Sequence, residues 1–548
     1  MNFLIPHGWR TRLHILSRSH RHLGILCGAI LIAGYAAATI IASTRDDGLS
    51  SHDETAALRH YFAKGLREVE ASPKPHDREL ANWLHDLCDE MPKTAAEWEL
   101  PIPTIADFIK TGQIFDVKVK EAIEHHAGPQ DQRAMFNDYV IASLEPKSTL
   151  GKEARERIEG AARRIPPAPL ANEFLGHLLD HVDLRMEALH AFRREGALPE
   201  AEYARDEALA LAIALGELQT LRELLDQPTY RAAASGYQLI SAGALLGDWR
   251  MQLKGTLKGL WERARWDVVM IGLLAASLWY SVFVRFGDRK PWRWITPLPA
   301  LLAGVLSVGP TIMLVHYQDT IMGLTEHGGF PRDLIYYVAG VGLREELCKL
   351  ALFAPFLPWL LRRRDPLQAL LTGAFVGLGF ALEENFGYYM RSGFDVATGR
   401  LLTANFFHAA MTGLIALAFY EMVRTRFAKA EPFIGTFVAV VLAHGIYDWA
   451  FTGGDSLPFV GDLSLISMLI LALLAHQFFH QVELMARPSG SVISLLSIFV
   501  VGSAFIVAIS LIMVAMETPS ILAVNVMAAN VVGYVPIVIF YLRRIGQL

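Results

Sequence analysis

The sequence predicts an all-α membrane protein: a polytopic membrane helical bundle of about ten spans, with an all-α extracytoplasmic domain between the first and second spans. Of its 548 residues, 53% are hydrophobic and only 19% are charged, which is too apolar for a soluble chain of this length. Long apolar runs dominate from residue 266 onward, whereas the region before it has amphipathic helical periodicity. A net charge of −5 gives no indication of nucleic-acid binding.

The first region, residues 1–43, is expected to be a basic cytoplasmic N-terminus followed by a signal-anchor helix. Residues 1–22 carry four arginines and no acidic residue. The apolar run that follows, residues 22–43, is longer than the ~7–15 residues of a cleaved signal peptide. We therefore expect an uncleaved anchor with its N-terminus inside.

Residues 44–265 are expected to form the extracytoplasmic helical domain, because charges are frequent there and no apolar run is long enough to span a bilayer. After a proline-rich linker, one stretch matches part of a tetratricopeptide pattern through Leu175, Gly176, Ala188 and Phe192. The match covers a single unit, so a tetratricopeptide-like array and a generic helical bundle both remain open. Either would suit peptide or protein binding.

About nine further spans follow, of which those up to residue 460 form the predicted membrane core (266–460) and the rest are additional C-terminal helices (461–548). Their approximate ranges are 267–284, 295–315, 334–358, 367–389, 403–423, 432–452, 461–481, 491–515 and 520–541. The basic loops alternate with loops poor in lysine and arginine, so the positive-inside rule predicts that both termini are cytoplasmic. The basic clusters are 285–293, 362–364, 424–429 and 543–544.

Ionisable and polar residues gather in four consecutive predicted spans. In chain order they are Glu345, Glu346 and Lys349; Glu383, Glu384 and Asn385; His408; and His444 and Asp448. A charge at the bilayer centre costs roughly 2.5–3.5 kcal/mol on insertion scales, so such residues are functional candidates. A rise of about 1.5 Å per residue along helices of alternating direction places all of them in the outer half of the bilayer. They are therefore expected to form one site.

Local spacing adds detail to this site. Glu345 and Lys349 share a helix face, while Glu346 points about 100° away from Glu345. His444 and Asp448 are also four residues apart, so Asp448 can orient the imidazole. Two glycines, Gly377 and Gly379, allow a neighbouring helix to approach closely.

This set of residues can carry out hydrolysis. A buried glutamate can activate water, and histidines or an asparagine amide can bind a metal or donate to an oxyanion. His408, His444 and Glu384 would suit an open zinc site, although no H-E-x-x-H signature is present. Taken singly, a Glu–Lys pair or a histidine near the interface is often only a packing device. Three other features are assigned to interfacial or packing roles: the His476/His480 pair, Glu421 and Asn530.

Four short motifs occur in order on these spans. They are EELCK (345–349), GLGFALEEN (377–385), RLLTANFFH with Arg400 and His408, and HGIYD (444–448). Together they resemble the PrsW family of intramembrane proteases, relatives of the CAAX-processing and bacteriocin-processing membrane peptidases. The resemblance covers about residues 295–452.

The resemblance implies a membrane-embedded endopeptidase of the bacterial inner (cytoplasmic) membrane, of either metallo- or glutamate type. Its substrate would be a membrane-anchored protein, such as an anti-sigma-type regulator in envelope stress signalling. Its cofactor would be a divalent metal such as zinc, or none. The implied centre is made of Glu345 as general base, Glu346, Glu384, His408 and His444, with Asn385 at the oxyanion, Asp448 orienting His444 and Lys349 in support.

Two other functions fit the same residues. Intramembrane carboxylates and histidines also mark ion paths, so an ion- or proton-coupled transporter is the main alternative. The lack of two related halves, which transporters often have, counts against it. A membrane sensor without catalysis is the third interpretation, in which the outer domain binds a ligand.

Overall fold

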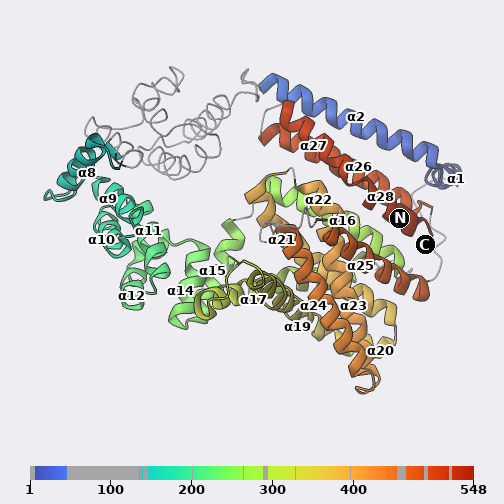
Figure 1. Ribbon diagram of the computed structural model, residues 1–548. Coiled ribbons are helices and arrows are strands. Elements are labelled where there is room, and N and C mark those ends of the chain that lie inside the picture. The colour runs from blue at the N-terminus through green and yellow to red at the C-terminus, as the bar shows by residue number, and fades with distance from the viewer. Residues whose placement is uncertain are drawn as a thin grey trace. The chain divides into compact units, whose positions relative to one another are not determined.

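The computed structural model (Figure 1) describes residues 7–45 and 146–547, with short gaps. The gaps are 200, 263–264, 288–293, 327–328, 395, 453–463, 487–491 and 518–520, and the isolated residues 135, 138, 139 and 142 are also described. All regular elements in this part of the chain are helices, which confirms the all-α prediction. Much of the predicted 44–265 domain, residues 46–134, lies outside the described residues.

The chain divides into two compact units, Met1–Asp46 with Trp249–Leu548, and Asp47–Asp248. In the first unit, eight described helices are long and apolar enough to cross a membrane. They are α2 (His20–Arg45), α16 (Trp266–Phe286), α17 (Leu298–Met322), α21 (Pro366–Ser392), α22 (Ala397–Leu402) with α23 (Ala404–Arg424), α24 (Ala430–Thr452), α25 (Ser464–Met485) and α26 (Leu495–Glu517).

Two further segments bring the described total close to the ten predicted spans. The first is the bent pair α27 (Ile521–Gly533) and α28 (Val535–Gln547), which meet at 47°. The second is an unbroken helical run, residues 332–363, whose ionisable residues set it apart from the apolar helices. It consists of α18 (Arg332–Ile335), the π-helix η2 (Tyr336–Gly342), α19 (Leu343–Phe353), the 3₁₀ turn η3 (Ala354–Phe356) and α20 (Leu357–Arg363).

Helix α21 is the centre of this unit and packs against α16, α17, α19 and α23. Glycines make the close contacts possible. A Cβ atom built on Gly377 would lie 2.6 Å from the carbonyl carbon of His408, and one on Gly379 would lie 2.9 Å from that of Leu301. Neither position leaves room for a side chain, so the close approach predicted at these two glycines is confirmed.

The second unit is built of short helices that follow one another with brief turns. They are α8 (Thr149–Ala162), α9 (Ala171–Asp180), α10 (Arg185–Gly196), α11 (Glu202–Ala214), α12 (Leu218–Asp226), α13 (Pro228–Ala233) and α14 (Gly236–Leu246), while α15 (Trp249–Glu262) packs on α17 in the first unit. In the α9–α10 hairpin, a Cβ on Gly176 would lie 2.7 Å from the Phe192 ring. These two positions of the tetratricopeptide pattern are therefore in contact, as they could be in either a tetratricopeptide-like array or a generic helical bundle.

A buried carboxylate caps helix α9 in this unit. Leu170 precedes the helix in a left-handed conformation without a side-chain cap. Glu195 of α10 instead accepts from the backbone N–H groups of Leu170 (2.6 Å) and Asn172 (3.1 Å). Burial raises the pKa of Glu195 to about 7, although these N–H groups oppose the rise. The folded unit therefore holds this proton more tightly than the unfolded chain, so its contribution to stability is complete below pH 4.5 and is lost as the pH rises to about 7.

Candidate active site

The EELCK residues begin helix α19, directly after the π-helix η2. A π-turn inside an α-helix is often found at a functional site because it shifts the face on which the following side chains lie. Helix α24 packs closely on η2 at two glycines. A Cβ on Gly445 would lie 2.6 Å from the Tyr337 carbonyl oxygen, and one on Gly342 would lie 2.7 Å from that of Val441. This approach brings His444, the neighbour of Gly445, to the two glutamates.

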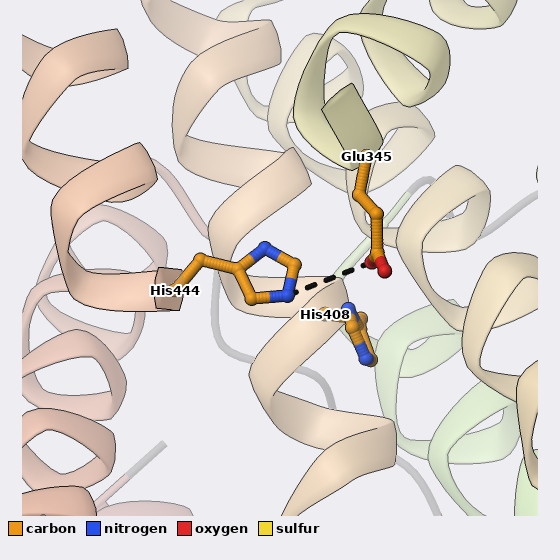
Figure 2. Close-up of side chains that lie close together, drawn as sticks. All are labelled: Glu345, His408 and His444. Atoms are coloured by element: carbon orange, nitrogen blue, oxygen red, sulfur yellow. Dashed lines mark ion pairs between the residues drawn. The ribbon is translucent and has the colours of Figure 1, made fainter. Parts of the chain in front are cut away.

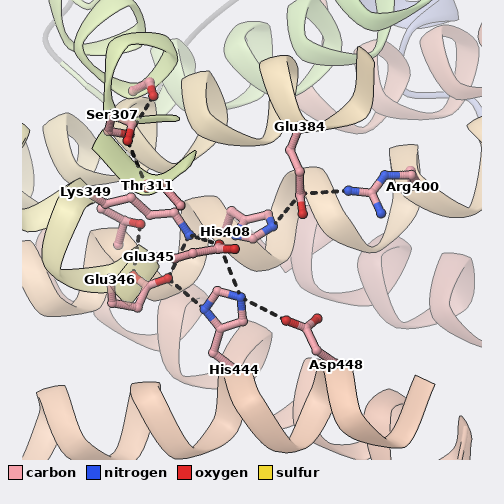
Figure 3. Close-up of polar contacts among 12 residues, drawn as sticks. Ser307, Thr311, Glu345, Glu346, Lys349, Glu384, Arg400, His408, His444 and Asp448 are labelled. Atoms are coloured by element: carbon pink, nitrogen blue, oxygen red, sulfur yellow. Dashed lines mark hydrogen bonds and ion pairs between the residues drawn. The ribbon is translucent and has the colours of Figure 1, made fainter. Parts of the chain in front are cut away.

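Lys349 lies at the centre of the polar network (Figure 3). Its ammonium donates to Glu345 Oε2 (3.2 Å), Glu346 Oε1 (2.8 Å) and His408 Nδ1 (2.9 Å). One face of the Phe380 ring lies 3.9 Å from Nζ and adds a cation–π contact. The three N–H groups of the ammonium thus meet three acceptors, which satisfies a fully buried charge. The predicted Glu345–Lys349 pair is confirmed.

The two glutamates differ in their surroundings. Glu346 is completely buried, and its carboxylate also contacts His444 Nδ1 (3.0 Å) and Thr412 Oγ1 (3.4 Å). Glu345 has fewer partners and a side chain that is 9% exposed. Although the helix turns by about 100° between them, both side chains reach Lys349, because the i,i+3 spacing of Glu346 is as suitable as the i,i+4 spacing of Glu345.

His408 connects this cluster to a second group of polar residues. Its Nδ1 accepts from Lys349, so the proton is assigned to Nε2, which donates to Glu384 Oε2 at 3.0 Å. Glu384 also accepts from Arg400 Nη2 at 2.7 Å. Arg400 additionally donates through Nε to Asn385 Oδ1. Glu384 thus holds the histidine in one orientation.

Asn385, predicted to assist an oxyanion, is engaged at both ends of its amide. Its oxygen accepts from Arg400, and its nitrogen donates to Asn405 Oδ1 at 2.9 Å. Because a guanidinium can only donate, the Arg400 contact fixes which end of the amide faces Asn405. In this arrangement Asn385 positions Arg400.

Both ring nitrogens of His444 face carboxylates. Nδ1 contacts Glu346, and Nε2 lies 3.3 Å from Asp448 Oδ2 and 3.5 Å from Glu345 Oε2. Asp448 therefore occupies the orienting position predicted for it. The Asp448 side chain is 29% exposed, whereas His444 is 1% exposed, so the site is more open on the side of Asp448.

Three residues have the geometry of a metal site (Figure 2). Ligand atoms of Glu345, His408 and His444 all lie within 4.8 Å of one another. One carboxylate and two imidazoles are a donor set that zinc uses in catalytic sites. Glu384, expected as the third ligand from the sequence, binds His408 and Arg400 instead. Among the described residues, Glu345 therefore replaces Glu384 in the group that could hold an ion.

Three contributors to the site are absent from the residues that the sequence predicts for it. Arg400 lies in one of the four motifs, and Asn405 and Thr412 lie three residues before and four residues after His408. That spacing places Asn405 and Thr412 on the His408 face of a helix.

Arg344 donates to Gln318 of the neighbouring helix α17.

The His476/His480 pair does not join the site. His476 contacts Arg544, and His480 lies 4.0 Å from Glu483.

A cluster of carboxylates and imidazoles within apolar spanning helices is the kind of site that a membrane-embedded hydrolase needs. Residues 290–476 match the model of the PrsW family intramembrane metalloprotease. This segment, about a third of the chain, is thus an intramembrane protease domain of that family, and it contains every site residue described above. Searches of curated proteins and of solved structures give no match.

Proposed function

We propose that the protein hydrolyses a peptide bond of a membrane-anchored protein close to the extracytoplasmic surface. The observation that supports this most directly is the convergence of Glu345, His408 and His444 from three different helices on one buried point. Hydrolysis needs a base for water, an oxyanion donor and a proton for the leaving amine. The cluster contains a candidate for each.

Glu345 is the proposed general base. It has fewer partners than Glu346 and is the less buried of the two. In the proposed reaction, the Glu345 carboxylate takes a proton from water as the oxygen attacks the carbonyl carbon. The proton then passes to the leaving nitrogen as the C–N bond breaks. Glu346 holds Lys349 and His444 in place.

His444 is the proposed oxyanion donor, through Nε2. Asp448 and Glu345 lie next to this nitrogen and orient its N–H group on the more open side of the site, where the oxyanion of a bound substrate would replace them as its acceptor. Asn385 would have to leave Asn405 to serve as a donor, so we assign it to positioning Arg400.

The residues present fit a divalent metal. Four carboxylates, Glu345, Glu346, Glu384 and Asp448, lie around two permanent cations, Lys349 and Arg400. With both histidines neutral, as metal ligation requires, the cluster has an excess of two negative charges, which a divalent ion would balance. Held by Glu345, His408 and His444, such an ion would take the place of the base and oxyanion donor assigned above, because it would acidify water and polarise the carbonyl.

The metal proposal has a direct test. We expect about one zinc ion per purified chain, the content of a catalytic zinc site of this type, and loss of it in His408→Ala and His444→Ala. Equal metal content in all three proteins, or active protein without bound metal, would favour a metal-free glutamate enzyme.

We further propose that the protein lies in the bacterial inner membrane with both termini in the cytoplasm. This topology puts the C-terminal ends of α21 and α24 on the outer side, and the partly exposed residues Glu384 and Asp448 lie toward those ends. A substrate would therefore enter from outside. An anti-sigma-type regulator has the required anchored form, and the helical 47–248 unit would recruit it.

The activity can be tested by comparing membrane proteomes of cells that produce wild type or Glu345→Gln. New peptide termini that require Glu345 identify the substrates. Glu346→Gln should also abolish them. Glu421→Gln is the matched control, because Glu421 binds only Arg424 and Lys429 among the described charged groups near it, away from the cluster. Full cleavage by the Glu345 variant would overturn the proposal.

A further inference from the structure

The short helix α22 carries Arg400 and is held by residues from distant parts of the chain. Six residues form too little helix to keep a fixed position without tertiary contacts. The helix is interrupted at Thr403, between α22 and α23, so the last carbonyl groups of α22 need hydrogen-bond donors from elsewhere.

Two buried aromatic side chains supply those partners. Trp279 of α16 donates its indole N–H to the Leu401 carbonyl at 2.7 Å. Tyr541 of α28 donates its hydroxyl to the Leu402 carbonyl at 2.9 Å. Trp279 and Tyr541 are both completely buried, and their rings meet edge to face at 5.2 Å. The two donors thus form one clamp on the end of α22.

The same two rings hold the start of α23. The Phe406 ring centroid lies 4.9 Å from that of Trp279 and 5.2 Å from that of Tyr541. Phe406 precedes His408 by two residues. The clamp therefore contacts the chain on both sides of the helix break, between Arg400 and His408.

Arg400 depends on accurate placement. Its planar guanidinium donates to Glu384 and Asn385 and stacks on the Tyr388 ring at 3.5 Å. Figure 3 shows the line of contacts from Arg400 through Glu384 to His408. A small shift of α22 would separate the Arg400 guanidinium from the Glu384 carboxylate, which orients His408.

We propose that Trp279 and Tyr541 are positioning residues of the protease, which fix Arg400 against Glu384 and thereby the orientation of His408. This inference rests on the proposed proteolytic function. Both residues lie outside the segment matched by the family model, residues 290–476. The first span after the 47–248 unit and the final span therefore complete the active-site scaffold.

The principal test is Tyr541→Phe, which removes one hydroxyl and keeps the ring. Tyr280→Phe is the matched control, because Tyr280 also donates its hydroxyl to a backbone carbonyl, that of Trp294, away from α22. Amide hydrogen exchange of the full-length protein in nanodiscs reports the clamp without a substrate. We expect exchange in residues 397–403 to rise about tenfold in Tyr541→Phe and in Trp279→Phe, and to stay unchanged in Tyr280→Phe.

The rate at which Glu345-dependent peptide termini appear shows whether the clamp on α22 affects the active site. Tyr541→Phe should lower this rate about tenfold. In an Arg400→Gln background, the same substitution should have less than a twofold further effect, because a residue that acts through Arg400 has nothing left to position. A merely structural contribution would slow both backgrounds equally.

Three results would overturn the inference: unchanged exchange in α22, wild-type cleavage by Tyr541→Phe, or equal losses in the two backgrounds. Absence of all Glu345-dependent cleavage in wild type would instead overturn the proposed function. Hydrogen exchange would then still decide whether the clamp holds α22.

Discussion

Gly377 is the point at which α21 touches the backbone that carries His408, and replacing it by alanine tests whether this contact sets the site. The new Cβ would lie 2.6 Å from the His408 carbonyl carbon and 2.8 Å from Ala409 Cα, whereas ordinary contacts begin at 3.4 Å. The two helices must therefore move apart by at least about 0.8 Å, the difference between 3.4 and 2.6 Å, because the His408 carbonyl oxygen would lie closer still to the new Cβ. Overpacking of this kind costs typically about 1–3 kcal/mol.

The displacement falls on His408, which links Lys349 to Glu384. Because a misplacement of about 1 Å can lower a catalytic rate by about 100-fold, we expect Gly377→Ala to slow cleavage by about 10- to 100-fold. The assay is the rate at which Glu345-dependent peptide termini appear, together with the thermal unfolding of the purified protein in detergent.

Gly435→Ala is the control for this experiment. It makes the same substitution in a spanning helix, at a position where a Cβ meets nothing within 4 Å. Both variants share the gain in helix propensity. Only the Gly377 variant introduces a clash, so a difference between the two variants reports that clash. A Gly377→Ala protein that cleaves at the wild-type rate, or a Gly435→Ala protein that is equally slow, would refute the reasoning.

Three further predictions concern single side chains. In thermal unfolding, Lys349→Met should lower the free energy of unfolding by about 3–5 kcal/mol, because it leaves buried carboxylates without their counter-charge. The control Lys429→Met removes an exposed ammonium and should change this free energy by less than about 1 kcal/mol. Asp448→Asn should reduce the cleavage rate about 10- to 100-fold by weakening the orientation of His444, and an unchanged rate would exclude that role. Between pH 4.5 and about 7, the wild-type 47–248 unit should lose about 3 kcal/mol of stability from Glu195. Amide exchange in α9, corrected for its intrinsic pH dependence, should show this loss, and Glu195→Gln should abolish it.

The sequence predicted the number and position of the apolar helices well. The lengths of the apolar runs follow from bilayer thickness, which acts on each segment separately. Spacing within one helix was equally informative. The Glu345–Lys349 and His444–Asp448 pairs are four residues apart, and both are in contact.

Relations between helices were less predictable. The helical rise placed Glu384 in the same layer as the histidines, but it could not show that Arg400 and His408 would both bind its carboxylate. It therefore suggested Glu384 as a metal ligand, where the geometry favours Glu345. It also left Asn385 available for an oxyanion, although two neighbours engage its amide.

The sequence by itself thus determined an all-α membrane protein with four polar motifs in order on successive spans, because helical rise and apolar length are local properties. Only the tertiary structure decided which of those polar groups touch one another. That depends on how closely helices pack, as at Gly377 and Gly445, and on contacts between residues far apart in the chain. The bonds from Trp279 and Tyr541 to α22 span more than a hundred positions, so no local pattern contains them.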